Sequence, residues 1–143
     1  MKTVLDVGSG TGVHSIALAQ EGFELLGIDR SSGMIRVAQE KTKSLSSDVK
    51  QRIKFMSKNY ENLDTLLGKK FDAAIFMGSA LAHIEDPQQV LQEISKALKD
   101  KAVIICQITN YDKIMKVNKR FFAFDIKKSP YAGEREHAFL RFF

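Results

Sequence analysis

Near its start the chain places an acid inside an apolar run and follows it with three glycines at every second position, in the stretch VLDVGSGTG. Glycine loses more conformational freedom on folding than any other residue, so such a cluster indicates a left-handed turn or a backbone that passes close to a ligand. Asp6 stands two residues before the first glycine, where a carboxylate repels a diphosphate and favours an ammonium group. The motif therefore predicts a loop that binds a small, positively charged ligand.

The glycine spacing departs from the dinucleotide-binding fingerprint. Gly8, Gly10 and Gly12 form G-x-G-x-G, whereas the fingerprint is G-x-G-x-x-G and needs its third glycine where this chain has Val13. Together with the charge of Asp6, this spacing disfavours a nicotinamide oxidoreductase. A nucleoside that carries an amino acid suits the loop better.

The elements that must position this loop alternate along the chain. Apolar, β-rich runs predict strands over residues 3–7, 23–29, 52–56, 71–77 and 102–109. Helical spacing predicts helices over residues 13–20, from Ser31 or Ser32 to about residue 38, and over 85–100. Five strands with helix-sized connections indicate a doubly wound α/β fold with a mostly parallel sheet, in which ligands bind at the carboxyl ends of the strands.

Length and composition describe one globular domain over residues 1–143, with 44% hydrophobic and 27% charged residues. No apolar run reaches membrane-spanning length and the start does not read as a signal peptide, so we expect a cytoplasmic protein that does not bind membranes. The single cysteine, Cys106, lies in the apolar stretch VIICQI and is expected to be buried. The three histidines are scattered, so no metal site is predicted.

The opening motif, together with the acid Asp29 at the end of the second expected strand, resembles the cofactor-binding core of class I S-adenosylmethionine-dependent methyltransferases. The resemblance covers about residues 3–114. The stretches FDAAIFMGSALAHIED and ITNYDKIM are similar to segments of glycine and sarcosine N-methyltransferases. The resemblance implies a Rossmann-like fold, S-adenosyl-L-methionine as cofactor, and methyl transfer. Such transfer depends on orientation, which can lower a barrier by roughly 7–11 kcal/mol.

The resemblance also assigns residues to the cofactor. It places cofactor contacts at Asp6, Gly8, Gly10, Asp29, Arg30, Asn59, Tyr60, Met77 and Gly78. Asp6 would favour the ammonium group, directly or through water, and Asp29 would accept hydrogen bonds from both ribose hydroxyls. Asn59 stands where the family often has an acid that contacts the adenine amine, and its carbonyl can still accept. Two positions keep two interpretations: Gly12 as a loop or a helix-packing residue, and Met34 as an adenine contact or a core residue.

The acceptor side of the site is carried over from GSALAHI and TNYD. The resemblance assigns substrate contacts to Ser79, Asn110 and Tyr111. It also implies that Tyr111 and His83 are the candidate catalytic residues. Both have a second interpretation, Tyr111 as a residue packed under a lid and His83 as a structural histidine. Thr109 stands where glycine-type enzymes carry an arginine that grips a carboxylate. We therefore expect a small-molecule nucleophile, an amine above all, rather than glycine or sarcosine itself.

Residues 111–143 depart from the alternating pattern of the core, residues 1–110. The segment is rich in phenylalanine, contains the turn signal SPYAG, and is expected to form a lid or a hairpin. It stops in the apolar run FLRFF, which predicts a sheet without its last strands and self-association through this exposed run. We also expect the helices that usually precede the glycine strand to be missing.

Two further functional interpretations remain open. The net charge of +5 lies partly in KTKSLSSDVKQRIKFMSK, a basic stretch that would suit an RNA methyltransferase. Nucleic acid is nevertheless the less favoured partner, because no base-methylation motif or RNA-binding module accompanies the stretch. The other alternative is a truncated, cofactor-binding remnant without activity.

Overall fold

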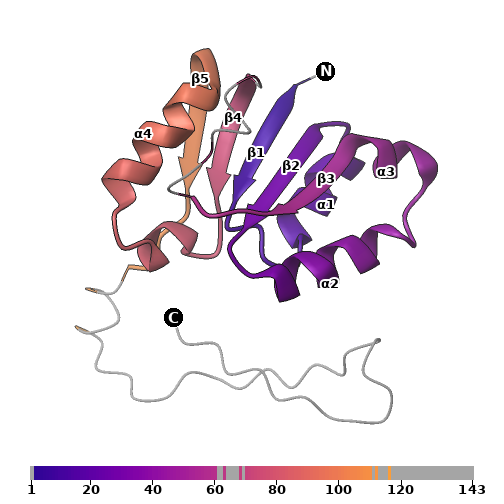
Figure 1. Ribbon diagram of the computed structural model, residues 1–143, viewed down its shortest axis with the longest axis horizontal. Coiled ribbons are helices and arrows are strands. Elements are labelled where there is room, and N and C mark those ends of the chain that lie inside the picture. Colours follow the sequence, from indigo (N-terminus) through magenta and orange to yellow (C-terminus); the bar gives the residue numbers. More distant parts are fainter. Residues whose placement is uncertain are drawn as a thin grey trace. The chain divides into compact units, whose positions relative to one another are not determined.

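The protein contains a five-stranded parallel sheet in the order β3-β2-β1-β4-β5 (Figure 1). The strands are β1 (Thr3–Val7), β2 (Glu24–Asp29), β3 (Ile53–Ser57), β4 (Phe71–Phe76) and β5 (Leu98–Cys106). The computed structural model describes residues 2–60, 63, 68, 70–110, 112 and 116. The strand order reverses beside β1, which creates the switch point where such sheets bind ligands. The predicted doubly wound α/β fold is confirmed.

The chain divides into two units, Met1–Ile108 and Thr109–Phe143. The first unit contains the whole described sheet and its helices. Most residues of the second unit, Tyr111 and the FLRFF run among them, lie outside the described residues. The expected lid or hairpin therefore remains a prediction.

Helices connect the strands. They are α1 (Val13–Gln20), α2 (Ser32–Thr42), α3 (Ser47–Arg52), the 3-10 turn η2 (Ala80–His83) and α4 (Pro87–Ala97). Side chains cap two of these helices: the hydroxyl of Ser31, one of the two predicted starts of α2, accepts from the Met34 N–H at 3.3 Å, and Asp86 accepts from the Gln89 N–H at 2.9 Å. Pro87 occupies the first position of α4, where its missing N–H costs no helical hydrogen bond.

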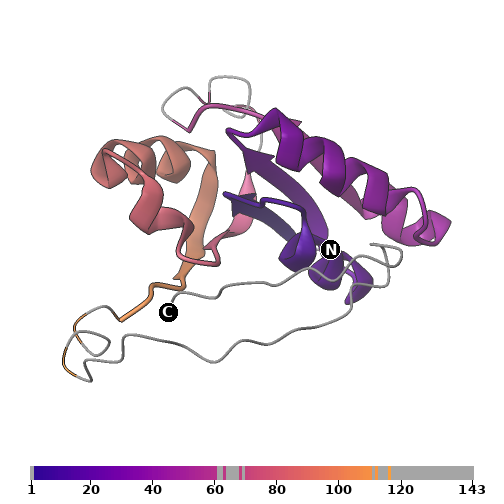
Figure 2. The same ribbon diagram turned by 90° about the horizontal axis from the view of Figure 1, so that it is seen from below.

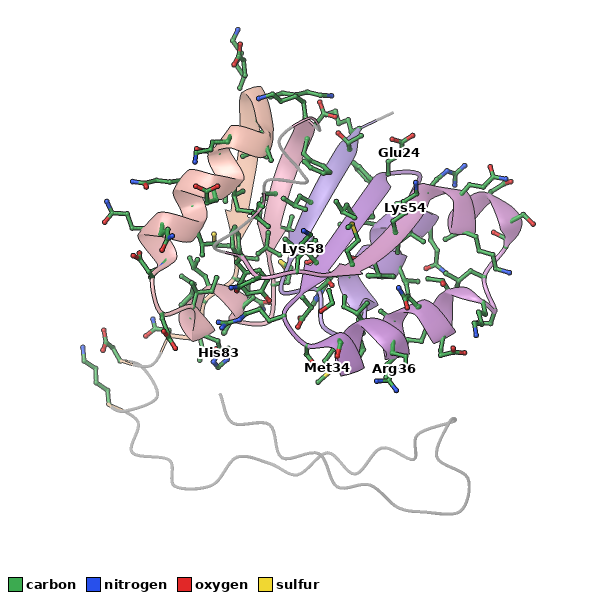
Figure 3. All side chains as sticks on the ribbon, viewed as in Figure 1. Glu24, Met34, Arg36, Lys54, Lys58 and His83 are labelled. Atoms are coloured by element: carbon green, nitrogen blue, oxygen red, sulfur yellow. The ribbon has the colours of Figure 1, made fainter. Side chains whose placement is uncertain are left out.

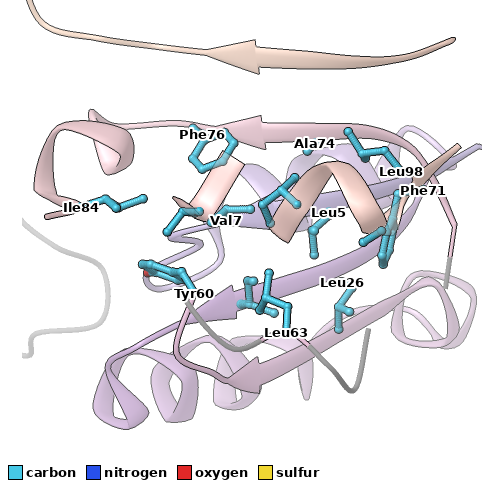
Figure 4. Close-up of a cluster of buried hydrophobic side chains, with 14 residues drawn as sticks. Leu5, Val7, Leu26, Tyr60, Leu63, Phe71, Ala74, Phe76, Ile84 and Leu98 are labelled. Atoms are coloured by element: carbon cyan, nitrogen blue, oxygen red, sulfur yellow. The ribbon is translucent and has the colours of Figure 1, made fainter. Parts of the chain in front are cut away.

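Helices cover both faces of the sheet (Figure 2), and a cluster of apolar side chains lies on each face. Alternate residues of β1 divide between them: Leu5 and Val7 pack with α4, and Val4 packs with α1, α2 and α3. Figure 4 shows the cluster on the α4 face, where Phe76 and Leu5 are among the fully buried side chains. By the same alternation the Asp6 side chain points to the α1 face.

Several boundaries differ from the sequence-based predictions. Helix α3 was not predicted, because Val49 is its only buried residue and a single apolar position creates no helical period. The predicted helix over residues 85–100 ends at Ala97, since Leu98 already pairs with Phe71 as the start of β5. A register shift next to Phe71 then accommodates Lys101, whose φ is 62°.

The expectation of a buried Cys106 was wrong, because Cys106 is exposed. Its strand, β5, is the outermost strand of the described sheet. Its neighbours Val103, Ile104 and Ile105 are exposed as well, at 40–55% of their surface. This stretch is therefore apolar in sequence, yet the described residues do not bury it.

Candidate functional site

The glycine loop follows β1 directly and turns through left-handed backbone. Gly8, Gly10 and Gly12 have φ values of 75°, 53° and 77°. The N–H groups of Gly8 and Ser9 donate to the Ile28 carbonyl at 2.9 and 3.0 Å, which ties the loop to the end of β2. All three glycines thus adopt a conformation that other residues take only at a steric cost.

The three glycines face different surroundings. A Cβ on Gly8 would lie 2.6 Å from the Ala80 Cβ, and one on Gly12 would lie 2.5 Å from the Phe55 ring. A Cβ on Gly10 would meet no atom of the described residues within 4 Å. Gly12 is therefore a packing residue under α1, the second of its two interpretations, whereas Gly10 borders open space.

Asp6 is a buried carboxylate with one oxygen satisfied. Its side chain is 1% exposed, and Oδ2 accepts a hydrogen bond of 2.6 Å from the Ser15 hydroxyl of α1. Oδ1 finds no hydrogen-bond partner among the described residues. Burial raises the pKa of Asp6, and the Ser15 hydrogen bond offsets part of that rise. A carboxylate of this kind has an acceptor available for a cation or a water molecule.

Asp29 joins the glycine loop to α2. Its Oδ2 accepts from the Gly10 N–H at 2.9 Å, and its Oδ1 accepts from the Ser31 N–H at 2.8 Å. Each carboxylate oxygen can accept more than one hydrogen bond, so both can also accept from a pair of ligand hydroxyls. Lys41 of α2 adds a second link, because its ammonium group donates to the Thr11 carbonyl and hydroxyl at 3.2 and 2.9 Å.

A cavity of about 210 Å³ lies next to Asp29, at the carboxyl ends of β2 and β3. Arg30, Ser57, Lys58 and Asn59 line it. The Lys58 N–H donates to the Asp29 carbonyl at 3.0 Å, so the segment after β3 is fixed beside the acid. Arg30 and Asn59, both assigned to the cofactor from the sequence, thus lie in one hollow.

A larger cavity of about 450 Å³ lies elsewhere, and its lining includes Glu24 at the start of β2. Figure 3 shows Glu24 at the opposite end of the sheet from Met34 and His83. The smaller hollow is the better candidate, because it lies at the carboxyl ends of β2 and β3, beside Asp29, whose carboxylate accepts from the Gly10 N–H of the left-handed loop. Volume alone does not identify a binding site.

The segment after β4 forms the other side of the sheet's carboxyl edge. Gly78 has a φ of 61°, no atom of the described residues lies within 4 Å of its Cβ position, and its N–H donates to the Gln107 side chain at 3.0 Å. Ser79 is also left-handed, with a φ of 64°. The Met77 carbonyl accepts from the Ala80 N–H at 3.1 Å, which leaves its second lone pair for a ligand.

The remaining predicted residues have different outcomes. Tyr60 is buried in the α4-face cluster, and its hydroxyl lies 3.6 Å from where a Gly8 Cβ would be. His83 lies exposed at the end of η2. Met34 is 46% exposed, so the interpretation of Met34 as a core residue was wrong. Asn110 belongs to the second unit, and Tyr111 lies outside the described residues.

Sequence reasoning missed three polar contacts of this edge: Ser15, Lys41 and Gln107. A signal existed for Ser15, because it is a polar residue within the apolar helix VHSIALAQ. Lys41 and Gln107 carry no such signal, since their contacts join residues about 30 positions apart in the chain.

The comparison with known families decides the class of this site. Residues 1–137 match the model of the methyltransferase domain family. The chain belongs to this family. The resemblance to class I S-adenosylmethionine-dependent methyltransferases expected from VLDVGSGTG and Asp29 is thereby confirmed.

Individual relatives agree with this assignment. A glycine/sarcosine N-methyltransferase of Parasynechococcus marenigrum (strain WH8102) is 30% identical over 117 residues, which is 80% of this chain and 40% of that protein. A glycine N-methyltransferase of Rattus norvegicus is 33% identical over 122 residues, 78% of this chain and 42% of that protein. The crystal structure of the PH0226 protein from Pyrococcus horikoshii OT3 aligns with a TM-score of 0.70 at 30% identity, over 88% of this chain and 57% of that one.

The methyltransferase domain thus spans about 40% of the length of these curated relatives. Among the described residues, no helix is both long enough and apolar enough to span a membrane.

Proposed function

We propose that this methyltransferase domain binds S-adenosyl-L-methionine at the carboxyl edge of its sheet and transfers the methyl group to a small-molecule amine. The observation that carries the proposal is the linked pair of acids at the glycine loop. Asp6 has one buried oxygen without a partner among the described residues, which suits an ammonium group, and Asp29 presents two acceptor oxygens, which suit a ribose diol. Gly10, whose N–H donates to Asp29, has no described atom within 4 Å of its Cβ position.

Further residues at this edge carry groups that can hydrogen-bond to S-adenosyl-L-methionine or leave room for it. Arg30 and Asn59 line the hollow beside Asp29, where the resemblance places the adenine. Gly78 borders open space on the β4 side. Bound S-adenosylmethionine supplies a methyl group already activated by a sulfonium. The protein then has to hold an unprotonated amine in line with the bond between the sulfur and the methyl group, and to exclude water. Methyl transfer in this geometry needs no covalent intermediate with the protein.

The choice of acceptor rests on Thr109. The names of the two N-methyltransferase relatives above include glycine and sarcosine, amines that carry a carboxylate. This chain has a threonine directly before Asn110, where the resemblance expects a carboxylate-binding arginine. One hydroxyl cannot replace the two parallel charged hydrogen bonds of an arginine. We therefore favour amines without a free carboxylate.

A matched pair of acceptors tests this proposal. Methyl transfer from labelled S-adenosylmethionine is measured with glycine and with glycinamide, which has a neutral carboxamide in place of the carboxylate. Because the amine of glycinamide is less basic than that of glycine, the rates are compared at equal concentrations of unprotonated amine. The wild-type protein should prefer glycinamide, and Thr109→Arg should shift the preference toward glycine. A wild-type preference for glycine would contradict the argument from Thr109. Transfer to short RNA alone would overturn the small-molecule proposal and favour the RNA methyltransferase interpretation.

A further inference from the structure

We infer that Ser15 is a positioning residue, which holds the Asp6 carboxylate through Oδ2 so that Oδ1 remains the acceptor for the cofactor's ammonium group, directly or through a bound water. The inference rests on the cofactor proposed above. It assigns a binding role to a helix residue that lies outside the glycine motif.

The geometry separates the two oxygens of Asp6. The Ser15 hydroxyl donates to Oδ2 at 2.6 Å, a short distance that is typical of a hydrogen bond to a charged oxygen. Both side chains are buried, Asp6 at 1% and Ser15 at 0% exposure. Oδ1 is left without a partner among the described residues, although a buried polar oxygen is normally hydrogen-bonded.

A second orphaned atom lies in the same loop. The Ser9 hydroxyl is buried and likewise finds no partner among the described residues. Asp6 and Ser9 flank the turn at Val7 and Gly8, just before Gly10 and its open space. Unsatisfied buried groups at one turn indicate a position where a ligand or a water completes the hydrogen bonding.

The presence of serine at this position favours a functional role over a purely structural one. Alanine is a better helix former than serine and would place no polar atom under the sheet-facing side of α1. Serine at residue 15 is useful because it donates to a carboxylate that is itself costly to bury. The pair is therefore best explained by what Asp6 binds.

The charges that reach Asp6 come from two elements. His14 precedes Ser15 in α1 and favours the charged form of Asp6, and Asp29 at the end of β2 opposes it. Ser15 contributes a hydrogen bond that also favours the charged form. Loss of the Ser15 hydroxyl should therefore move the protonation of Asp6 to higher pH, toward the range in which the protein binds its ligand.

The test measures binding of S-adenosylhomocysteine by calorimetry from about pH 5 to about pH 8. Ser15→Ala removes the donor, and Ser15→Cys keeps the volume with a weak donor. The control is Ser95→Ala, which removes a hydroxyl that donates to the Gln92 carbonyl on the exposed side of α4. A His14→Gln background removes the imidazole whose charge acts on Asp6.

We expect Ser15→Ala to weaken binding about tenfold near neutral pH and to shift the acid loss of binding to higher pH. Ser15→Cys should fall between Ser15→Ala and the wild type, and Ser95→Ala should match the wild type. The shift should persist in the His14→Gln background. 5′-Methylthioadenosine lacks the amino-acid part, so its affinity should be the same for the wild type and for both Ser15 variants.

Two results would overturn the inference: folded Ser15 variants that bind S-adenosylhomocysteine with the wild-type pH profile, or an equal loss of 5′-methylthioadenosine binding. The second result would mean that the hydroxyl supports the loop in general. A wild-type protein that binds neither compound would contradict the proposed cofactor itself, and the inference with it.

Discussion

At the scale of single residues, the two acids of the candidate site differ in how well the fold satisfies their carboxylates. The carboxylate of Asp6 is buried beside one donor and keeps one oxygen unpartnered among the described residues. Asp29 differs, since backbone N–H groups of Gly10 and Ser31 already occupy both of its oxygens. One acid is therefore placed at a cost to stability, and the other helps to build the loop.

Replacement of Asp6 should separate stability from binding. Burial raises the folded pKa of Asp6, so its contribution to stability is complete below its unfolded pKa of 3.8 and is lost as the pH rises through the raised value. Asp6→Asn is uncharged at every pH and should raise the Tm near neutral pH by roughly 2–5 °C while it weakens binding of S-adenosylhomocysteine.

Thermal unfolding across pH, with calorimetry at neutral pH, measures both effects of Asp6→Asn. Asp100→Asn, which removes an exposed carboxylate of β5, is the matched control. A lower Tm together with unchanged ligand affinity would mean that Asp6 is a structural residue.

At the scale of elements, the carboxyl ends of parallel strands bring the loop, Asp29 and the residues after β3 and β4 together. This placement could be predicted from sequence, because alternating strands and helices leave little freedom in where those ends lie. The role of Ser15 could not be predicted from sequence, because the spacing of apolar residues in α1 does not show which residue of that helix contacts Asp6 of β1. The start of β5 at Leu98 was missed because pairing with β4 overrides the helical pattern.

The glycines of the loop should respond differently to alanine. Gly10→Ala places a methyl group in open space and should cost about 1 kcal/mol of stability from its positive φ, with a large loss of ligand binding. Gly12→Ala meets the Phe55 ring at 2.5 Å and should cost a further 1–3 kcal/mol, roughly, through overpacking. Chemical denaturation of both variants measures the difference, and equal losses of stability would contradict the distinct surroundings assigned to the two glycines.

The opposite edge of the sheet depends on Asp72, which accepts from the Thr3 N–H at 2.8 Å and from the Lys99 ammonium at 2.9 Å. The Thr3 backbone hydrogen bond is the main cause that lowers the pKa of Asp72 to about 2. A lowered pKa stabilises the fold above the unfolded value of 3.8, and this contribution is lost as the pH falls toward about 2.

Asp72→Asn should therefore lower the Tm at neutral pH, and the difference from the wild type should shrink as the solution is acidified below about pH 4. Thermal unfolding at a series of pH values measures it, with Asp100→Asn as the exposed control. A difference that stays constant down to the acid limit would mean that the charge of Asp72 is not what ties β1, β4 and β5 together.

At the scale of the whole molecule, the apolar surface of β5 sets the expected solution behaviour. Val103 and Ile105 are 55% and 51% exposed, and Ile108 beyond the strand is 58% exposed. An outer strand with such a surface is a site for association. We therefore expect the 143-residue chain to bind a hydrophobic dye and to associate as its concentration rises.

Light scattering and dye fluorescence test this behaviour, with the double variant Val103→Thr and Ile105→Thr as the comparison. Both signals should fall in the double variant, because its two changes make the same face of β5 more polar while keeping β-branched side chains. A wild-type chain that stays monomeric and does not bind the dye would contradict the prediction.

The most direct test of the central claim is a calorimetric titration of the protein with S-adenosylhomocysteine and with NAD⁺, repeated for Asp29→Ala. We predict saturable binding of S-adenosylhomocysteine, a loss of affinity of at least roughly tenfold in Asp29→Ala, and no binding of NAD⁺. Circular dichroism confirms that the variant is folded. Binding of NAD⁺ in place of S-adenosylhomocysteine, or equal S-adenosylhomocysteine affinity in the wild type and in folded Asp29→Ala, would contradict the central claim.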